Sequence, residues 1–167
     1  INLSGASLAD TTLMDFILAM IDKHEVSASS FCFEVTETSA IQNYARATVF
    51  VERLKQEGAT FALDDFGNGF SSFAYLKKLA VDYLKIDGSF VKDIEADPID
   101  RAMVESVNNI GHTMGMHTIA EYVHNKRLRE ILTDMGVDYG RGFAISKPEP
   151  LPSPEDVGSA ERQRKSG

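Results

Sequence analysis

The sequence predicts an α/β fold built on a parallel sheet. Two observations support this prediction: short apolar runs alternate with helical patterns along the chain, and these runs are apolar on both faces. Strands that alternate with helices form parallel sheets, and such sheets are covered by helices. The chain has 167 residues, of which 43% are hydrophobic and 25% charged, which is enough for one domain with a core of its own.

The first half of the chain is expected to contain three strands and two helices. The strands are Ile1–Ser4, Ser30–Thr36 and a run that begins at Thr60. The helices are Leu8–His24, started by Asp10, Thr11 or Thr12, and Ser39–Glu57, ended by Gly58. In the second helix the apolar face is expected to contain Val49, Phe50 and Leu54.

The second half continues the same alternation. The expected elements are a helical segment at Phe70–Leu79, a strand at Val81–Asp87, a helix at Pro98–Met114, a strand at Met116–Val123, a helix at Asn125–Met135 and a strand at Tyr139–Ile145. From Leu151 the composition shifts to Pro, Ser, Gly and charged residues. We therefore predict a domain over residues 1–150 and a disordered tail over residues 151–167.

Charge and cysteine content restrict the class of protein. The chain has 17 basic and 25 acidic residues, a formal net charge of −8. This balance does not indicate a protein that binds duplex nucleic acid through its overall charge. No apolar segment is long enough to cross a bilayer, and Cys32 is the only cysteine, so no intrachain disulfide forms. We expect a cytoplasmic domain. Because the chain opens with Ile1 inside an apparent strand, a longer protein with an upstream membrane anchor is left open.

The stretch Thr60–Phe73 carries the strongest chemical signal. An apolar run leads directly into Asp64 and Asp65, and a glycine-rich turn follows. Neighbouring carboxylates repel each other, and burying them unpaired is costly. A hard divalent cation such as Mg²⁺, Mn²⁺ or Ca²⁺ would neutralise them. The alternative is that Asp64 or Asp65 caps a turn or a helix.

Further polar residues recur at the carboxyl ends of the other expected strands, where parallel α/β sheets and barrels build their sites. They are Asn2, Glu34, Glu37, Lys85, Asp87 and Glu121. Each has a simpler interpretation as well: Asn2 as a turn cap, Glu37 as an acid interacting with a helix dipole, and Lys85 as the partner of Asp87 or another acid in a structural salt bridge. The histidines His24, His112 and His117 show no metal-ligand spacing.

With these residues in order, the chain resembles the EAL-domain family of bacterial cyclic di-GMP phosphodiesterases from Asn2 to about Pro148. The matching stretches are Asn2–Ser4, Glu34–Glu37, Asp64–Ser72, Leu84–Asp87, Ala120–Val123 and Ser146–Pro148. The resemblance implies a TIM-like (β/α) barrel, here an incomplete one of about six parallel strands with outer helices. It also implies metal-dependent hydrolysis of cyclic di-GMP to the linear dinucleotide, with Mg²⁺ or Mn²⁺ in a two-metal site.

The resemblance also assigns roles to residues. Asn2, Glu34 and Asp64 would bind one metal, and Asp64 would bridge to a second with Asp65 beside it. Glu121 would join these metal ligands and, with Lys85, would position or activate the attacking water. Glu37 would hold the loop that begins at Asp65. Substrate binding would fall to Arg141, Asp87 and Asp65.

Three departures from the family pattern leave an alternative open. The Glu-Ala-Leu motif is absent from the chain, His124 stands where the family has a second Glu, and Arg141 stands where a Gln is common. The alternative is a catalytically weakened EAL domain that acts as a cyclic di-GMP sensor or protein-interaction module. A third and less favoured hypothesis is a magnesium-dependent barrel enzyme that acts on sugars.

Six strands cannot close an eight-stranded barrel without exposing edges. We therefore expect the fragment alone to be inactive and the missing strands to come from another chain, another fragment or oligomerisation. An upstream signalling or sensory domain is expected, as is a homo-oligomer. Phe70, Phe73 and Tyr75 are predicted interface residues, with core packing as the equally weighted alternative.

Overall fold

The computed structural model describes residues 1–67 and 73–150, and its centre is a six-stranded sheet in the order β1-β2-β3-β4-β5-β6. Every neighbouring pair of strands is parallel. The strands are β1 (Asn2–Leu3), β2 (Cys32–Thr36), β3 (Thr60–Phe66), β4 (Tyr83–Ile86), β5 (His117–Ala120) and β6 (Tyr139–Gly140). The predicted parallel α/β fold is confirmed.

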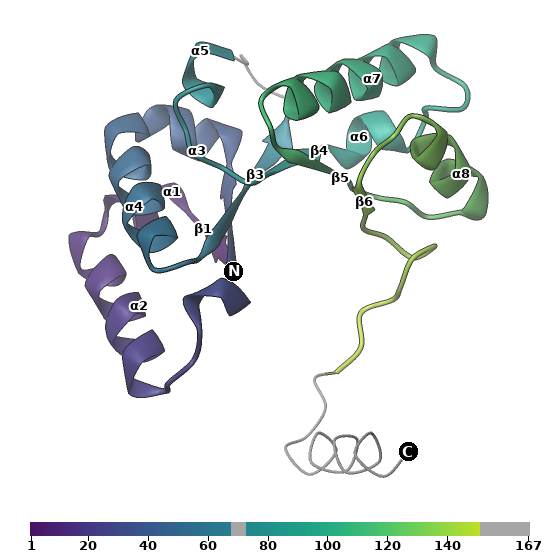
Figure 1. Cartoon of the computed structure of the whole chain (residues 1–167). Coiled ribbons are helices and arrows are strands. Elements are labelled where there is room, and N and C mark those ends of the chain that lie inside the picture. Colours follow the sequence, from purple (N-terminus) through teal and green to yellow (C-terminus); the bar gives the residue numbers. More distant parts are fainter. Residues whose placement is uncertain (68–72, 151–167) are drawn as a thin grey trace, which may run out of the picture.

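The helices connect consecutive strands. They are α1 (Gly5–Ala9), α2 (Thr11–Lys23), the short 3₁₀ helix η1 (Ala28–Ser30), α3 (Glu37–Gln42), α4 (Tyr44–Gln56), α5 (Phe73–Leu76), α6 (Gly88–Val91), α7 (Pro98–Thr113) and α8 (Lys126–Asp134). In Figure 1, α4, α7 and α8 lie around the outside of the strands, in an arc from the left through the top to the right. This arrangement is that of a barrel with outer helices, of which six strands are present.

One helix that the sequence analysis expected to be continuous is split, and the other is preceded by a short helix that was not predicted. Asp10 ends α1 and starts α2, where its side chain accepts a hydrogen bond of 2.8 Å from the Thr12 backbone N–H. Asn43 separates α3 from α4. Asp and Asn compete for backbone hydrogen bonds with their own side chains, which favours helix boundaries at these positions. The start of α2 at Asp10, one of the three predicted starts, is confirmed, and α2 continues to Lys23 without a break. The short helix α1 before it was not predicted, and the continuity of the helix expected at Ser39–Glu57 was wrong.

The core lies between the sheet and the outer helices. Phe33 on β2 and Phe61 on β3 are fully buried, with ring centroids 5.4 Å apart. Helix α7 packs closely on the sheet because Gly111 has no side chain: a Cβ there would lie 2.7 Å from Thr118 Cγ2. Val49 is 60% exposed, so its predicted place on the apolar face of the helix is wrong, although Phe50 and Leu54 are buried.

The last two strands are shorter than predicted. The strand expected to continue to Val123 ends at Ala120, because Tyr122 has a φ of +58° and leaves the extended conformation. The strand expected to continue to Ile145 ends at Gly140. The turn after it packs against Val123, and a Cβ on Gly142 would lie within 2.4 Å of the Val123 carbonyl oxygen. The close approach of the two backbones therefore requires glycine at this position.

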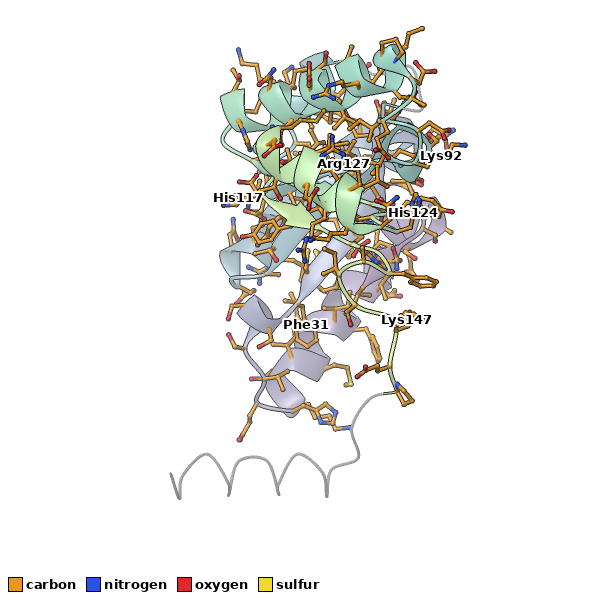
Figure 2. The ribbon with its side chains drawn as sticks, turned by 90° about the vertical axis from the view of Figure 1, so that its right-hand side faces the viewer. Phe31, Lys92, His117, His124, Arg127 and Lys147 are labelled. Carbon is orange, nitrogen blue, oxygen red and sulfur yellow. The ribbon has the colours of Figure 1, made fainter. Side chains whose placement is uncertain are left out.

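The described residues leave an apolar surface beside β1. Helix α2 has no fully buried residue, and Phe16 on it is 59% exposed. A groove of about 330 Å³ runs along this surface between α2 and Phe31, which is labelled in Figure 2. Among the helices that the structure describes, none combines the length and the hydropathy needed to cross a membrane.

Candidate active site

The sheet brings four side chains from different strand ends into direct contact. The ammonium of Lys85 on β4 lies 2.6 Å from Glu34 Oε2, 2.8 Å from Asp64 Oδ1 and 3.0 Å from Glu121 Oε1. Glu34 lies on β2, Asp64 on β3, and Glu121 directly follows β5. The Lys85 side chain is only 3% exposed. These predicted site residues therefore meet at one point, and Lys85 pairs with these three acids instead of with Asp87.

The three carboxylates hold Lys85 in its charged form. Burial by itself would lower the pKa of Lys85, but the hydrogen bonds to Asp64, Glu34 and Glu121 raise it above its ordinary value. A permanently charged ammonium cannot accept a proton. Lys85 can therefore supply positive charge and hydrogen bonds at this site, but it cannot act as a general base.

Asp64 and Asp65 both reach the site because the strand is irregular between them. In a regular strand, successive side chains point to opposite faces. Here the register between β3 and β4 shifts between Leu63 and Phe66, and Asp65 has a φ of +57°. The Asp65 backbone N–H donates a hydrogen bond of 3.0 Å to Asp64 Oδ1. Partial desolvation, together with the charges of Asp64, Asp87 and Glu121, raises the pKa of Asp65.

The donor atoms of this cluster fit a hard divalent cation. Asp64, Asp65 and Glu121 each offer an oxygen, and the three oxygens lie within 4.8 Å of one another. Oxygen-only ligands are those that Mg²⁺, Mn²⁺ and Ca²⁺ take in proteins. With Glu34, four carboxylates face the single buried ammonium of Lys85, so the site retains an excess of negative charge that a cation would neutralise.

Two more predicted residues lie at the edges of this cluster. Asn2 on β1 is the register partner of Glu34 on β2, which places it at the same end of the sheet, and its role as a metal ligand stays a prediction. Glu37, the first residue of α3, is buried, and its Oε2 accepts a hydrogen bond of 3.4 Å from the Gly67 backbone N–H. This contact ties α3 to the turn after β3. The continuation of that turn, residues 68–72, lies outside the described residues.

Two of the three predicted substrate-binding residues, Arg141 and Asp87, line a cavity next to the cluster, whereas Asp65 belongs to the cluster itself. Arg141 Nη1 lies 3.7 Å from Glu121 Oε1 and 3.9 Å from Glu34 Oε2. Asp87 caps α6 by accepting a hydrogen bond of 2.7 Å from the Ser89 backbone N–H. Both residues line a cavity of about 680 Å³, together with Glu121.

Other residues around this cavity were not predicted. Lys92, which directly follows α6, Tyr122 and Phe143 line it as well. Figure 2 shows Lys92 and His124 on the same side of the molecule, opposite His117. Tyr122 and Phe143 were expected inside strands, and Lys92 belonged to no predicted element, so none of the three was identified as a cavity residue.

The histidines lie outside the acid cluster, as predicted from their spacing. His112 on α7 and His117 on β5 both approach Asp138, at 2.9 Å and 3.6 Å. Asp138 also accepts a hydrogen bond of 2.7 Å from the Thr118 backbone N–H. Partial burial opposes ionisation of Asp138, but the hydrogen bonds from Thr118 and His112 outweigh it and lower its pKa to about 2. The sequence analysis did not identify Asp138 as a residue that connects α7 and β5.

The predicted interface residues are only partly described. Phe70 lies outside the described residues, and the side chain of Phe73 is likewise not described. Tyr75 is 42% exposed, and its ring lies 5.1 Å from that of Tyr44 on α4. Its role in an interface stays a prediction.

The fold and the site together define an α/β barrel domain whose strand ends gather carboxylates around a buried lysine. The chain belongs to the EAL domain family, whose model matches residues 1–148.

Relatives of this chain include two proteins named as cyclic di-GMP phosphodiesterases. PdeB of Shewanella oneidensis is 42% identical over 153 residues, which cover 92% of this chain and 18% of PdeB. PdeF of Escherichia coli is 37% identical over 151 residues, which cover 90% of this chain and 20% of PdeF. The chain therefore spans about a fifth of the length of these relatives.

Solved structures agree with this assignment. The MucR phosphodiesterase in complex with c-di-GMP superposes with a TM-score of 0.86 at 33% identity, over 90% of this chain and 61% of that one. The EAL domain of DcpA from Mycobacterium smegmatis superposes with a TM-score of 0.81 at 32% identity, over 89% of this chain and 66% of that one. The predicted TIM-like barrel architecture is confirmed.

Proposed function

We propose that this chain contributes acidic residues to the active site of a phosphodiesterase that hydrolyses cyclic di-GMP to the linear dinucleotide. The observation that carries this proposal is the contact of the buried Lys85 ammonium with carboxylates from three strand ends. Relatives that are at least 37% identical bear the name of this activity, and the MucR structure contains c-di-GMP. Since the chain covers part of each relative, the activity is proposed for the full-length protein.

The proposed metals are Mg²⁺ or Mn²⁺ in a two-metal site. Asn2, Glu34 and Asp64 would hold one ion, and Asp64, Asp65 and Glu121 would hold the other. When bound, the two ions would supply the charge that stabilises the attacking and leaving oxygens of an in-line displacement. The support for this assignment is the cluster of carboxylate oxygens and its excess negative charge.

The protein groups would have distinct tasks in this reaction. Lys85 would hold positive charge close to the phosphodiester, where additional negative charge develops. Glu121, between Lys85 and the cavity, would orient the attacking water and accept its proton. Glu37 would keep the turn at Gly67 in place beside Asp65. Arg141 and Asp87 would bind the substrate in the adjoining cavity.

We also propose that the domain acts within a larger signalling protein in the cytoplasm and assembles as a homo-oligomer. A relative from Pseudomonas aeruginosa, MucR, is named as a bifunctional diguanylate cyclase and phosphodiesterase, and this chain covers 22% of it. The second activity in this name and the low coverage support a larger protein that contains more than the region matched here.

The alternative is a domain that binds cyclic di-GMP as a sensor or protein-interaction module without turnover. The residues His124 and Arg141 favour it, because each changes the polar pattern near Glu121. The experiment is to follow release of the linear dinucleotide from cyclic di-GMP by the full-length protein with Mg²⁺ or Mn²⁺, and binding of cyclic di-GMP in the same preparation. Turnover abolished by Glu121→Gln supports the phosphodiesterase. Binding without turnover supports the sensor.

A further inference from the structure

The side chain of Asn108 joins three elements of the fold inside the core. Asn108 lies on α7 and is only 3% exposed. Its Oδ1 accepts a hydrogen bond of 2.6 Å from Thr118 Oγ1 on β5, and its Nδ2 donates one of 3.0 Å to the carbonyl of Met135, which caps α8. One amide therefore connects α7 to a strand and to the end of another helix.

An amide is an uncommon side chain at such a buried position. The other buried residues of α7 are Val104, Val107 and Gly111. Burying an amide is unfavourable unless its hydrogen bonds are made, so its net contribution to stability is small even when they are made. Hydrogen bonds are directional, however, and apolar contacts are not. Asn108 therefore restricts how these elements fit together more strongly than an apolar residue would.

The hydrogen bonds of Asn108 continue to the start of β6. The Thr118 backbone N–H donates to Asp138 Oδ2 at 2.7 Å, and the Asp138 backbone N–H donates to Thr118 Oγ1 at 3.4 Å. Asp138 directly precedes β6. The segment that leads from α8 into β6 is thus held at both ends, at Met135 by Asn108 and at Asp138 by Thr118.

The register of β6 depends on few other contacts, because this strand is short. β5 pairs with β4 over four residue pairs, whereas β6 pairs with β5 over two. Arg141 directly follows β6, and its backbone N–H donates to the Ala120 carbonyl at 2.8 Å. A slip of one residue would turn the Arg141 side chain to the other face of the sheet, away from Glu121. The contacts at the start of β6 therefore help to place Arg141.

These contacts lie at the other end of the strands from the acid cluster. Figure 2 shows His117, the first residue of β5, on the opposite side of the molecule from His124, which follows β5. Thr118 is next to His117, whereas Glu121 follows the last residue of the strand. An effect of Asn108 on the cluster must therefore pass along β5 and β6.

We propose that Asn108 is a positioning residue, whose amide fixes the register of β6 against β5 and so holds Arg141 beside the acid cluster. The inference rests on the proposed function, in which Arg141 binds the substrate. Asn108 itself contacts neither substrate nor metal in this role.

The first test is hydrogen–deuterium exchange in the full-length protein. Asn108→Leu removes the two hydrogen bonds and keeps a side chain of similar size. We expect exchange about tenfold faster in peptides that contain Arg141 and Val123, whose backbones are joined by a 3.0 Å hydrogen bond, and unchanged exchange in β2 and β3. Asn109→Leu is the matched control, because Asn109 is the next residue on α7 and is exposed, and it should exchange as the wild type does. Unchanged exchange in Asn108→Leu, or an equal increase in every strand, overturns the positioning role.

The double variant Asn108→Leu/Thr118→Val separates positioning from stability. Neither member of this pair is then left with an unmatched polar group, so most of the melting temperature lost in Asn108→Leu should return. Exchange at Arg141 should remain raised, because the apolar pair makes no directional contact. If exchange returns to the wild-type rate together with the melting temperature, the amide acts only as a stabilising group and the positioning role is overturned.

Mn²⁺ affinity reports on the position of Arg141 without turnover, because its guanidinium lies 3.7 Å from Glu121 Oε1. Asn108→Leu should change this affinity in the same direction as Arg141→Gln, by about fivefold or less, and should have no further effect in the Arg141→Gln background. An equal effect in both backgrounds overturns the inference. Faster exchange confined to β6 and its neighbours, in a protein that does not hydrolyse cyclic di-GMP, supports the positioning role and overturns only the proposed function.

Discussion

Lys85 on β4 reaches past β3 to Glu34 on β2, and the Lys85 Nζ to Glu34 Oε2 distance is 2.6 Å. The ion pair therefore joins two strands that do not pair with each other. Asp64, on the strand between them, contacts the same ammonium at 2.8 Å. The arrangement of the acidic residues thus depends on one buried positive charge, and a bound metal would compete with this charge for the same oxygens.

Replacement of Lys85 by Met should destabilise the fold in a way that depends on bound metal. The change leaves three carboxylates without their common partner, so we expect a loss of about 3–5 kcal/mol in the free energy of unfolding without metal. Excess Mn²⁺ should recover part of this loss, because it supplies the missing positive charge. Urea denaturation with EDTA and with Mn²⁺ measures both effects.

Lys126→Met is the control for this change, because Lys126 is 79% exposed on α8. We expect it to alter the unfolding free energy by less than about 1 kcal/mol, with no dependence on Mn²⁺. If Lys85→Met is as stable as this control in EDTA, the ammonium does not hold the carboxylates together.

Replacement of Arg141 by Gln should strengthen metal binding. Arg141 places a second positive charge 3.7 Å and 3.9 Å from two carboxylates of the cluster. Its side chain is 66% exposed, so solvent screens the interaction and the gain should be about fivefold or less in Mn²⁺ affinity. Isothermal titration with Mn²⁺ at low and high salt measures it, and the gain should shrink as salt rises. A decrease in Mn²⁺ affinity would instead make Arg141 a support for the ligand geometry.

The sequence predicted the fold and most of the acid cluster for a shared physical reason. A parallel sheet requires apolar strands, so Glu34 and Lys85 were recognisable as charges that need partners inside apolar runs. The strand ends of such a sheet lie at one edge, which predicted that these residues meet. Which residues would pair was not predictable, because Lys85 could have met Asp87 as readily as Glu34.

The parts that were missed depend on backbone conformation. Tyr122 continues an apolar run in the sequence, and nothing in that run indicates that its φ would be +58°. The split of the second long helix at Asn43 was hidden by apolar spacing that continues on both sides. Asp138 was not recognised as an anchor, because its partners His112 and Thr118 are at least 20 residues away in sequence.

The chain studied by itself should associate in a concentration-dependent way. Its apolar groove beside α2 includes Phe16, and the outer edge of β1 has no strand paired to it within the described residues. Exposed apolar patches and open strand edges favour association. Sedimentation equilibrium should show a mass above that of the monomer, and Phe16→Asp should lower it. Val49→Asp is the control, because Val49 is also exposed but does not line the groove. A wild-type monomer at every concentration would contradict the expectation.

Asp138→Asn should lower the stability of the fold at neutral pH, and the effect should disappear in acid. The pKa of Asp138 is lowered to about 2 in the folded state, against about 3.9 for an unperturbed Asp. A lowered folded-state pKa means that the ionised form stabilises the fold at pH above about 4, and that this contribution is lost as the pH falls from about 4 to 2. The two pKa values would correspond to about 2.6 kcal/mol at pH 7 in the absence of solvent screening. Because Asp138 is exposed to solvent, the measured difference should be smaller, about 1 kcal/mol. Urea denaturation at several pH values should therefore show a difference in unfolding free energy between wild type and Asp138→Asn that narrows below pH 4.

Asp134→Asn on α8 is the control, since Asp134 is exposed, and its unfolding free energy should show no such difference from wild type. A gap that stays constant from pH 7 to 3 would mean that the hydrogen-bond geometry of Asp138 contributes more than its charge does.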